Sequence, residues 1–148
     1  MLSLTDVAEL AREDGLAVVS TLRADHTVQT TVVNVGVLKH PVTGDDAVGL
    51  VTYGRAKLAN LRRWPHTTIT VRSGSHWIGV EGRAWVVGPD DPQDGFDADR
   101  LRLLLRDVFI AAGGTHDNWT EYDLAMEQQR RAAVLITPTR IYSNTFPG

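Results

Sequence analysis

Residues 51–63 (VTYGRAKLANLRR) place two positive charges at the start of a predicted helix. The pattern predicts a strand, then Gly54, then a helix that begins at Arg55. Arg55 and Lys57 would lie in the first helical turn, where the helix dipole disfavours each cation by about 0.3–1 kcal/mol. A bound anion would remove this conflict, because free backbone N–H groups, the dipole and both side chains could face it. The segment therefore predicts a phosphate site, and a solvent-exposed basic helix is the alternative.

Two predicted strands carry side chains that could border a flat ligand. Residues 74–82 (GSHWIGVEG) contain Trp77, which could form one wall of such a site, although packing in the sheet is the favoured interpretation for a single tryptophan. Residues 29–34 (QTTVVN) would alternate in direction along an extended strand. One side would hold Thr30, Val32 and Asn34, and the other Thr31 and Val33. Such a row of small side chains could lie along a heteroaromatic ring, but ordinary barrel strands show the same pattern.

Several other kinds of site are not supported by the sequence. It has no GxxxxGK[ST], GxGxxG or HExxH motif. The histidines lie at positions 26, 40, 66, 76 and 116, and no two have the spacing of metal ligands, so no metal site is predicted. The absence of cysteine excludes disulfides and a cysteine nucleophile, and it fits a cytoplasmic protein. Tyr53, His76 and Tyr142 are candidate proton donors, but packing or surface position explains each equally well, so no catalytic residue is assigned.

The charge balance argues against a nucleic-acid-binding protein. The chain has 15 Lys and Arg against 18 Asp and Glu, a net charge of −3. Residues 1–74 carry a net +1 and residues 75–148 a net −4, so any basic site must be local. No run of eighteen apolar residues is present, and the first residues carry acids where a signal peptide would carry lysines. We therefore expect neither a membrane span nor secretion.

The 148 residues fit one domain that spans positions 1–148. A first helix would begin at Ser3 or Thr5 and stop at Gly15. The predicted strands are residues 16–22, 27–35, 47–52, 67–72, 77–87 and 133–143, the last broken by Pro138, and the later helices are residues 55–64, 97–112 and 120–131. Strands without strict strand–helix alternation favour a mainly β (α+β) fold, a six-stranded antiparallel barrel with peripheral helices.

The order of these segments resembles the split β-barrel family of pyridoxamine-phosphate-oxidase-like proteins. The likeness covers nearly the whole chain, and its most specific parts are GRAKLANLRR and GGTHDNW. Within the family, the chain is most similar to the actinobacterial branch that uses the deazaflavin coenzyme F420. This resemblance implies an FMN-binding type of split barrel that forms a homodimer, with two cofactor sites at the subunit interface.

The resemblance also implies a set of cofactor-binding residues. They are Thr30, Val32, Val33, Asn34, Val51, Thr52, Arg55, Ala56, Lys57, Asn60, Arg72 and Trp77. Positions 55–57 match the family's phosphate-binding turn, the strand positions match those along the cofactor ring, and Trp77 matches a position that approaches the cofactor from the other subunit. Asn60 and Arg72 match the region of the cofactor's tail or phosphate. The longer phosphate motif and the C-terminal substrate motif of the family's FMN-using oxidases are incomplete here, which argues against pyridoxamine-phosphate oxidase activity itself.

Three functions follow from these observations. The leading hypothesis is an F420-dependent oxidoreductase that transfers a hydride between the deazaflavin and an unsaturated or quinone-like small molecule. An FMN-dependent oxidase or reductase with the same fold is the first alternative, and a non-catalytic F420 carrier is the second. In each case an anionic cofactor explains local basic residues on an acidic protein.

Overall fold

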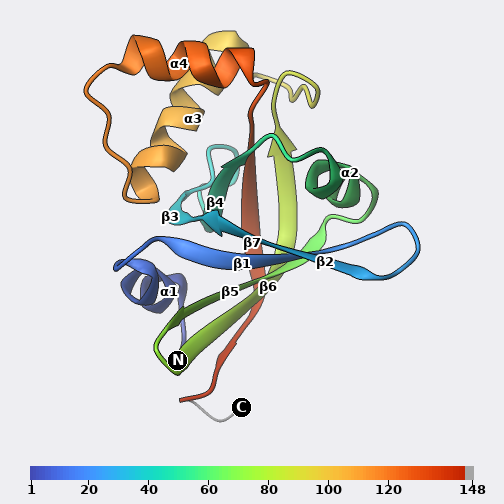
Figure 1. The fold of residues 1–148 in the computed structure, drawn as a ribbon, viewed down its shortest axis with the longest axis vertical. Coiled ribbons are helices and arrows are strands. Elements are labelled where there is room, and N and C mark those ends of the chain that lie inside the picture. The colour runs from blue at the N-terminus through green and yellow to red at the C-terminus, as the bar shows by residue number, and fades with distance from the viewer. Residues whose placement is uncertain (146–148) are drawn as a thin grey trace.

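The computed structural model describes residues 1–145, which form four helices and one seven-stranded antiparallel sheet (Figure 1). The helices are α1 (Leu4–Ala11), α2 (Arg55–Arg63), α3 (Ala98–Ala111) and α4 (Trp119–Gln128). The strands are β1 (Leu16–Leu22), β2 (Val28–Asn34), β3 (Gly36–Lys39), β4 (Asp46–Thr52), β5 (His66–Ser73), β6 (His76–Val87) and β7 (Ala132–Ser143). The spatial order is β2-β1-β5-β6-β7-β4-β3. The mainly β architecture with peripheral helices is therefore confirmed.

The prediction of a six-stranded barrel is wrong in its number of strands, and the seven-stranded sheet is not closed. The chain changes its pairing partner at Val35 and Gly36. β2 pairs with β1, whereas β3, only two residues later, pairs with β4 at the opposite edge of the sheet. Val35 is buried, and its N–H donates to the carbonyl of Gly15 at 2.8 Å. Gly36 lies so close to the end of α3 that a Cβ would sit 2.2 Å from the carbonyl carbon of Ala111. The two edge strands of the sheet, β2 and β3, thus follow each other in the sequence but do not pair with each other.

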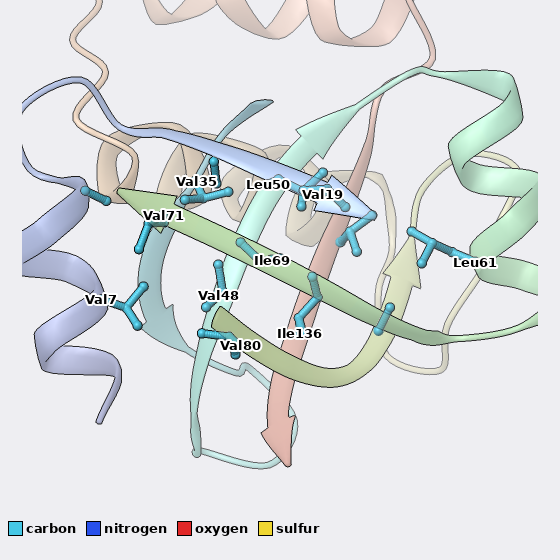
Figure 2. Packing of buried hydrophobic residues seen from close by; sticks show 14 of the residues in the cluster. Val7, Val19, Val35, Val48, Leu50, Leu61, Ile69, Val71, Val80 and Ile136 are labelled. Atoms are coloured by element: carbon cyan, nitrogen blue, oxygen red, sulfur yellow. The ribbon is translucent and has the colours of Figure 1, made fainter. Parts of the chain in front are cut away.

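The hydrophobic core is divided between the two faces of the sheet. One cluster fills the space enclosed by the curved sheet, where side chains from α1, α2 and strands β1, β4, β5, β6 and β7 meet (Figure 2). A second cluster lies under α3 and α4. β7 contributes side chains to both clusters. Val134 and Ile136 belong to the first cluster, and Ala133 and Leu135, which point to the other face of the sheet, belong to the second. The pair α3–α4 is therefore fixed against the sheet by its own core.

β7 runs unbroken from Ala132 to Ser143, although the sequence predicted a break at Pro138. The register between β6 and β7 shifts at Glu81 and Gly82, opposite this proline. A bulge of this kind accommodates a residue that has no N–H to donate to the ladder. Among the residues that the structure describes, no helix is long and apolar enough to cross a membrane.

The ring of His40 holds the loop after β3 through two hydrogen bonds. Its ring is buried against Trp85, with the ring centroids 4.7 Å apart, and its Nδ1 accepts hydrogen bonds from the N–H groups of Val42 (3.1 Å) and Thr43 (3.4 Å). Burial lowers the pKa of His40 below 6.5, and the nearby Asp45 only partly opposes this. Protonation of Nδ1 would remove both hydrogen bonds.

We expect the protein to lose stability as the pH falls through the lowered pKa of His40. The unfolded chain takes up this proton more readily than the folded chain, so the stabilising contribution of neutral His40 is complete only above about pH 6.5. Urea unfolding of the wild type and of His40→Asn between about pH 7.5 and 5.5 tests this. Asparagine keeps an acceptor for the same N–H groups but cannot titrate, so its curve should be flatter. An identical pH dependence in both proteins would contradict the expectation.

Candidate functional site

A cleft of about 630 Å³ lies where β2, the end of β4 and the start of α2 face the helices α3 and α4. Its volume is in the range of small-molecule and cofactor sites. It is lined by Thr31, Val32, Val33, Asn34, Val51, Thr52, Tyr53, Gly54, Lys57, Val108, Phe109, Ala112, Tyr122, Met126 and Arg131. The lining contains two cations and no carboxylate, on a chain whose net charge is −3.

The cleft brings together half of the residues predicted from the sequence. Val32, Val33, Asn34, Val51, Thr52 and Lys57 all line it. Thr30 lies further along β2 with an exposed side chain, and Arg55 and Ala56 are exposed in the first turn of α2, so none of the three forms part of the lining.

Lys57 is the most unusual residue of the cleft. It is only 6% exposed, and among the described residues its side chain has no hydrogen bond or ion pair. Burial lowers the pKa of its ammonium group. A charged group that is largely buried is costly unless a partner of opposite charge compensates it. The cleft beside Lys57 therefore suits an anion.

The start of α2 supports the same interpretation. The other three helices are capped by the side chains of Ser3, Asp97 and Asn118, which accept hydrogen bonds from first-turn N–H groups. The residue at the N-cap of α2 is Gly54, which has no side chain to form such a cap. The first-turn N–H groups of α2 are thus available to a ligand oxygen on the same side as Lys57.

Arg131 and Tyr53 belong to the cleft but were not predicted as binding residues. The Arg131 guanidinium lies 4.0 Å from the centroid of the Tyr53 ring, and Tyr53 is 57% exposed. Burial lowers the pKa of Arg131. The sequence shows two adjacent arginines directly before the apolar strand β7, which could have indicated an anion-binding residue. Their distance in the sequence from the first turn of α2 does not indicate that they lie near it.

The wall formed by α3 and α4 was also missed. The helical stripe that includes Val108 and Phe109 predicts a buried face, which does not indicate that its edge borders a ligand site. The hydroxyl of Tyr122 donates to the carbonyl of Leu105 at 3.1 Å, and burial raises its pKa to about 12, so this group holds α4 against α3. On the opposite wall, the buried Thr31 hydroxyl has no hydrogen-bond partner among the described residues.

Asn60 is not part of the lining of the cleft, and it connects α2 to the sheet. It is buried, and its Nδ2 donates to Thr21 Oγ1 and to Gln29 Oε1, each at 3.1 Å. These bonds fix the helix that carries Lys57. Asn60 therefore positions the site and does not line it.

Arg72 and Trp77 lie at the far end of the β5–β6 hairpin, away from the cleft of the same chain. The Arg72 guanidinium donates to the carbonyl of Gly74 at 3.1 Å. The Trp77 ring is 37% exposed and packs edge-on against Tyr142, with the centroids 6.1 Å apart. Of the three candidate proton donors, Tyr53 lies in the cleft, whereas His76 and Tyr142 do not.

The residues that the structure describes contain no cluster of three His, Asp or Glu side chains that could hold a metal ion. The cleft combines apolar and polar side chains with two cations, Lys57 and Arg131, near the start of α2. Such an arrangement can bind a flat apolar ring that carries anionic groups.

No family model matches the chain. Its structure is similar to that of Rv2991, a conserved hypothetical protein of Mycobacterium tuberculosis, with a TM-score of 0.68 and 19% identity over 100% of this chain and 91% of the other. It is also similar to an F420 reductase of Mycobacterium smegmatis (TM-score 0.60, 15% identity, 90% and 94% covered). A Clostridium acetobutylicum protein of the pyridoxinephosphate oxidase family has a TM-score of 0.61 and 12% identity, with 95% and 86% covered.

These likenesses establish the fold. The chain has the split-barrel fold of pyridoxamine 5′-phosphate oxidase-like proteins, as its sequence segments suggested.

Proposed function

We propose that the protein is an oxidoreductase that binds the deazaflavin coenzyme F420 in the cleft between β2, β4 and the start of α2. The observation that carries this proposal is Lys57, a residue only 6% exposed whose ammonium group has no partner among the described residues, in a cleft that has no carboxylate. A phosphate at the uncapped end of α2 would compensate that charge. The F420 reductase of similar fold supports the choice of cofactor.

The side chains of the cleft would bind and orient the cofactor. Lys57 and the first-turn N–H groups of α2 would hold its phosphate, while Val32, Val33 and Val51 would flank its ring. The unpartnered Thr31 hydroxyl would hydrogen-bond a polar edge of the ring. The wall of α3 and α4 would exclude water from this region. When bound, F420 supplies hydride transfer to an unsaturated or quinone-like small molecule.

Titration of the purified protein with F420 and with FMN, followed by fluorescence, tests the cofactor. We expect F420 to bind at least about tenfold more tightly, a difference of roughly 1.4 kcal/mol. Equal or reversed affinities would favour the FMN-dependent alternative. Turnover with reduced F420 on a panel of quinones and enones then tests the reaction. Tight binding without turnover on any acceptor would contradict an oxidoreductase and favour a carrier.

We also propose that two copies of the chain form a homodimer. The outward face of β1 and β2 exposes Leu16, Val18, Val28 and Val32, and Val18 lies directly opposite Val32 in the ladder. An exposed apolar face of this kind on two neighbouring strands typically marks a contact surface, and homodimers with two-fold symmetry are the commonest assemblies. In such a dimer, Trp77 would approach the cofactor of the partner subunit.

Light scattering at micromolar concentration should give about twice the chain mass of 16.3 kDa. Val18→Glu should shift the mass to that of one chain, because a carboxylate would be buried at the centre of the apolar face. Leu124→Glu is the matched control, since Leu124 is an exposed leucine on α4, away from this face. A wild-type protein that stays monomeric would contradict both the dimer and the interfacial site.

A further inference from the structure

Arg131 differs from all but one of the arginines near α3 and α4. The exception is Arg100, which also has no carboxylate partner among the described residues, but it is exposed and donates to the carbonyl of Gly95. The side chains of Arg62, Arg102, Arg106 and Arg130 all have carboxylate partners: Asp91, Asp99, Asp123 and Asp90 among them. Arg131 is partly buried and has no carboxylate partner among the described residues. A partly desolvated guanidinium without an anion indicates a place for one.

The orientation of the Arg131 guanidinium is fixed by two contacts. One of its faces lies on the Tyr53 ring at 4.0 Å, and its Nε donates to Gln129 Oε1 at 2.8 Å. The two terminal nitrogens have no partner among the described residues. They therefore present a planar pair of N–H donors whose direction is set in advance, which is the geometry that a carboxylate matches with two parallel hydrogen bonds.

The charges around Arg131 determine the side from which an anion approaches. Arg131 and Met126 separate the cleft described above from a second cleft of about 550 Å³, which lies between residues 88–102 and the end of α4. The second cleft is lined by four carboxylates, those of Asp97, Asp99, Asp123 and Glu127. Its two further cations, Arg102 and Arg130, already pair with carboxylates, so an anion there would be repelled by the remaining negative charge. The first cleft has no carboxylate. An anion at Arg131 therefore lies in the first cleft.

We propose that Arg131 binds a carboxylate of the ligand in the first cleft, at a position separate from the phosphate at Lys57. This inference rests on the proposed function. The planar fork of an arginine fits a carboxylate or a phosphate with two hydrogen bonds. Because the proposed phosphate lies at Lys57 and the uncapped start of α2, the anionic group that remains for Arg131 is a carboxylate. Two sources share this chemistry, namely the acidic tail of the cofactor and a carboxylate on the molecule that it reduces.

The first experiment needs neither cofactor nor turnover. The Nε–H resonance of Arg131 is assigned by its loss in Arg131→Lys and is followed by NMR while glutarate or its neutral diamide is added. We expect a saturable shift with glutarate and none with the diamide. No shift with glutarate, or equal shifts with both, would overturn the proposal. This result does not depend on whether F420 binds. A failure of the carboxylate site can therefore be distinguished from a failure of the proposed function.

The second experiment identifies the source of the carboxylate. F420 and the same deazaflavin phosphate without glutamyl residues are titrated into wild type, Arg131→Gln and the control Arg130→Gln, whose arginine already pairs with Asp90 at 2.5 Å. If the tail supplies the carboxylate, Arg131→Gln should weaken only the binding of the tailed cofactor, by about tenfold or more.

If the reduced molecule supplies the carboxylate, Arg131→Gln should leave both cofactor affinities unchanged. It should then raise KM about tenfold for carboxylate-bearing acceptors relative to their methyl esters, with little change in kcat. Arg131→Lys, which keeps the charge but loses the fork, should restore only part of the affinity in either case. If Arg131→Gln behaves like Arg130→Gln in every measurement, Arg131 does not bind a carboxylate.

Discussion

Replacing Lys57 by methionine should weaken F420 binding about tenfold to a hundredfold and leave the folded protein at least as stable as wild type. The lost charge-assisted hydrogen bond to a phosphate contributes roughly 1.5–3 kcal/mol to binding. The folded protein without ligand loses only the ammonium group of a residue that is 6% exposed. This group has no partner among the described residues and lies at the positive end of a helix dipole. Methionine keeps most of the apolar volume of the lysine side chain, so the change opens little space.

Binding is measured by fluorescence titration and stability by thermal unfolding without ligand. Arg55→Met is the matched control, because Arg55 lies in the same turn but is exposed. It should have a smaller effect on binding and almost none on stability. Added salt should weaken F420 binding to the wild type more than F420 binding to the Lys57 variant, since the variant lacks the ionic contact that salt screens. A Lys57→Met protein that binds F420 as well as wild type would refute Lys57 as the phosphate ligand.

Among the glycines that the structure describes, Gly36 is the one whose change to alanine should cost the most stability. The new methyl group would overlap the backbone of Ala111 and Ala112, at 2.2–2.4 Å, where no flexible side chain can move aside. Either α3 or the junction of β2 and β3 must shift, at a cost of about 1–3 kcal/mol or more. We expect the midpoint of thermal unfolding to fall by about 3–4 °C for each kcal/mol lost.

Because Ala112 lines the cleft, a shift of α3 should also weaken cofactor binding. Gly54→Ala is the control for stability, since a Cβ there makes only ordinary contacts, at 3.5 Å with Thr52 Oγ1 and 3.8 Å with Lys57 Cβ. Its unfolding midpoint should stay within a few degrees of wild type. A Gly36→Ala protein as stable as this control would show that the end of α3 can move at little energetic cost. That result would contradict the tight packing of Gly36 against Ala111 and Ala112.

The sequence predicted the fold well wherever local patterns decide the structure. All four helices and six of the seven strands lie within a few residues of their predicted positions, because Ser3, Gly54 and Pro65 mark helix ends and valine-rich alternation marks strands. β3 was missed for a different reason. From Gly36 on, the chain pairs with β4 and no longer with β1. Gly36 packs against the end of α3, which follows more than sixty residues later in the sequence, so the sequence near Gly36 does not show this change.

The same distinction applies to the site. Lys57 was predicted because its conflict with the helix dipole is visible in a short segment, and the strands along the cleft were predicted from a resemblance. Arg131 and the wall of α3 and α4 were not predicted, because only the folded chain brings them to α2. Tyr53 directly precedes Gly54 in the sequence and was considered only as a proton donor. Asn60 was predicted as a cofactor ligand, whereas its hydrogen bonds to Thr21 and Gln29 give it a positioning role.

The most direct test of F420 binding at the start of α2 is a crystal structure of the protein with the coenzyme. We expect the cofactor phosphate within about 3 Å of Lys57 Nζ and of first-turn N–H groups of α2. The deazaflavin ring should then lie against Val32, Val33 and Val51. A phosphate bound away from Lys57, or a coenzyme found only outside the cleft between β2, β4 and α2, would contradict this assignment.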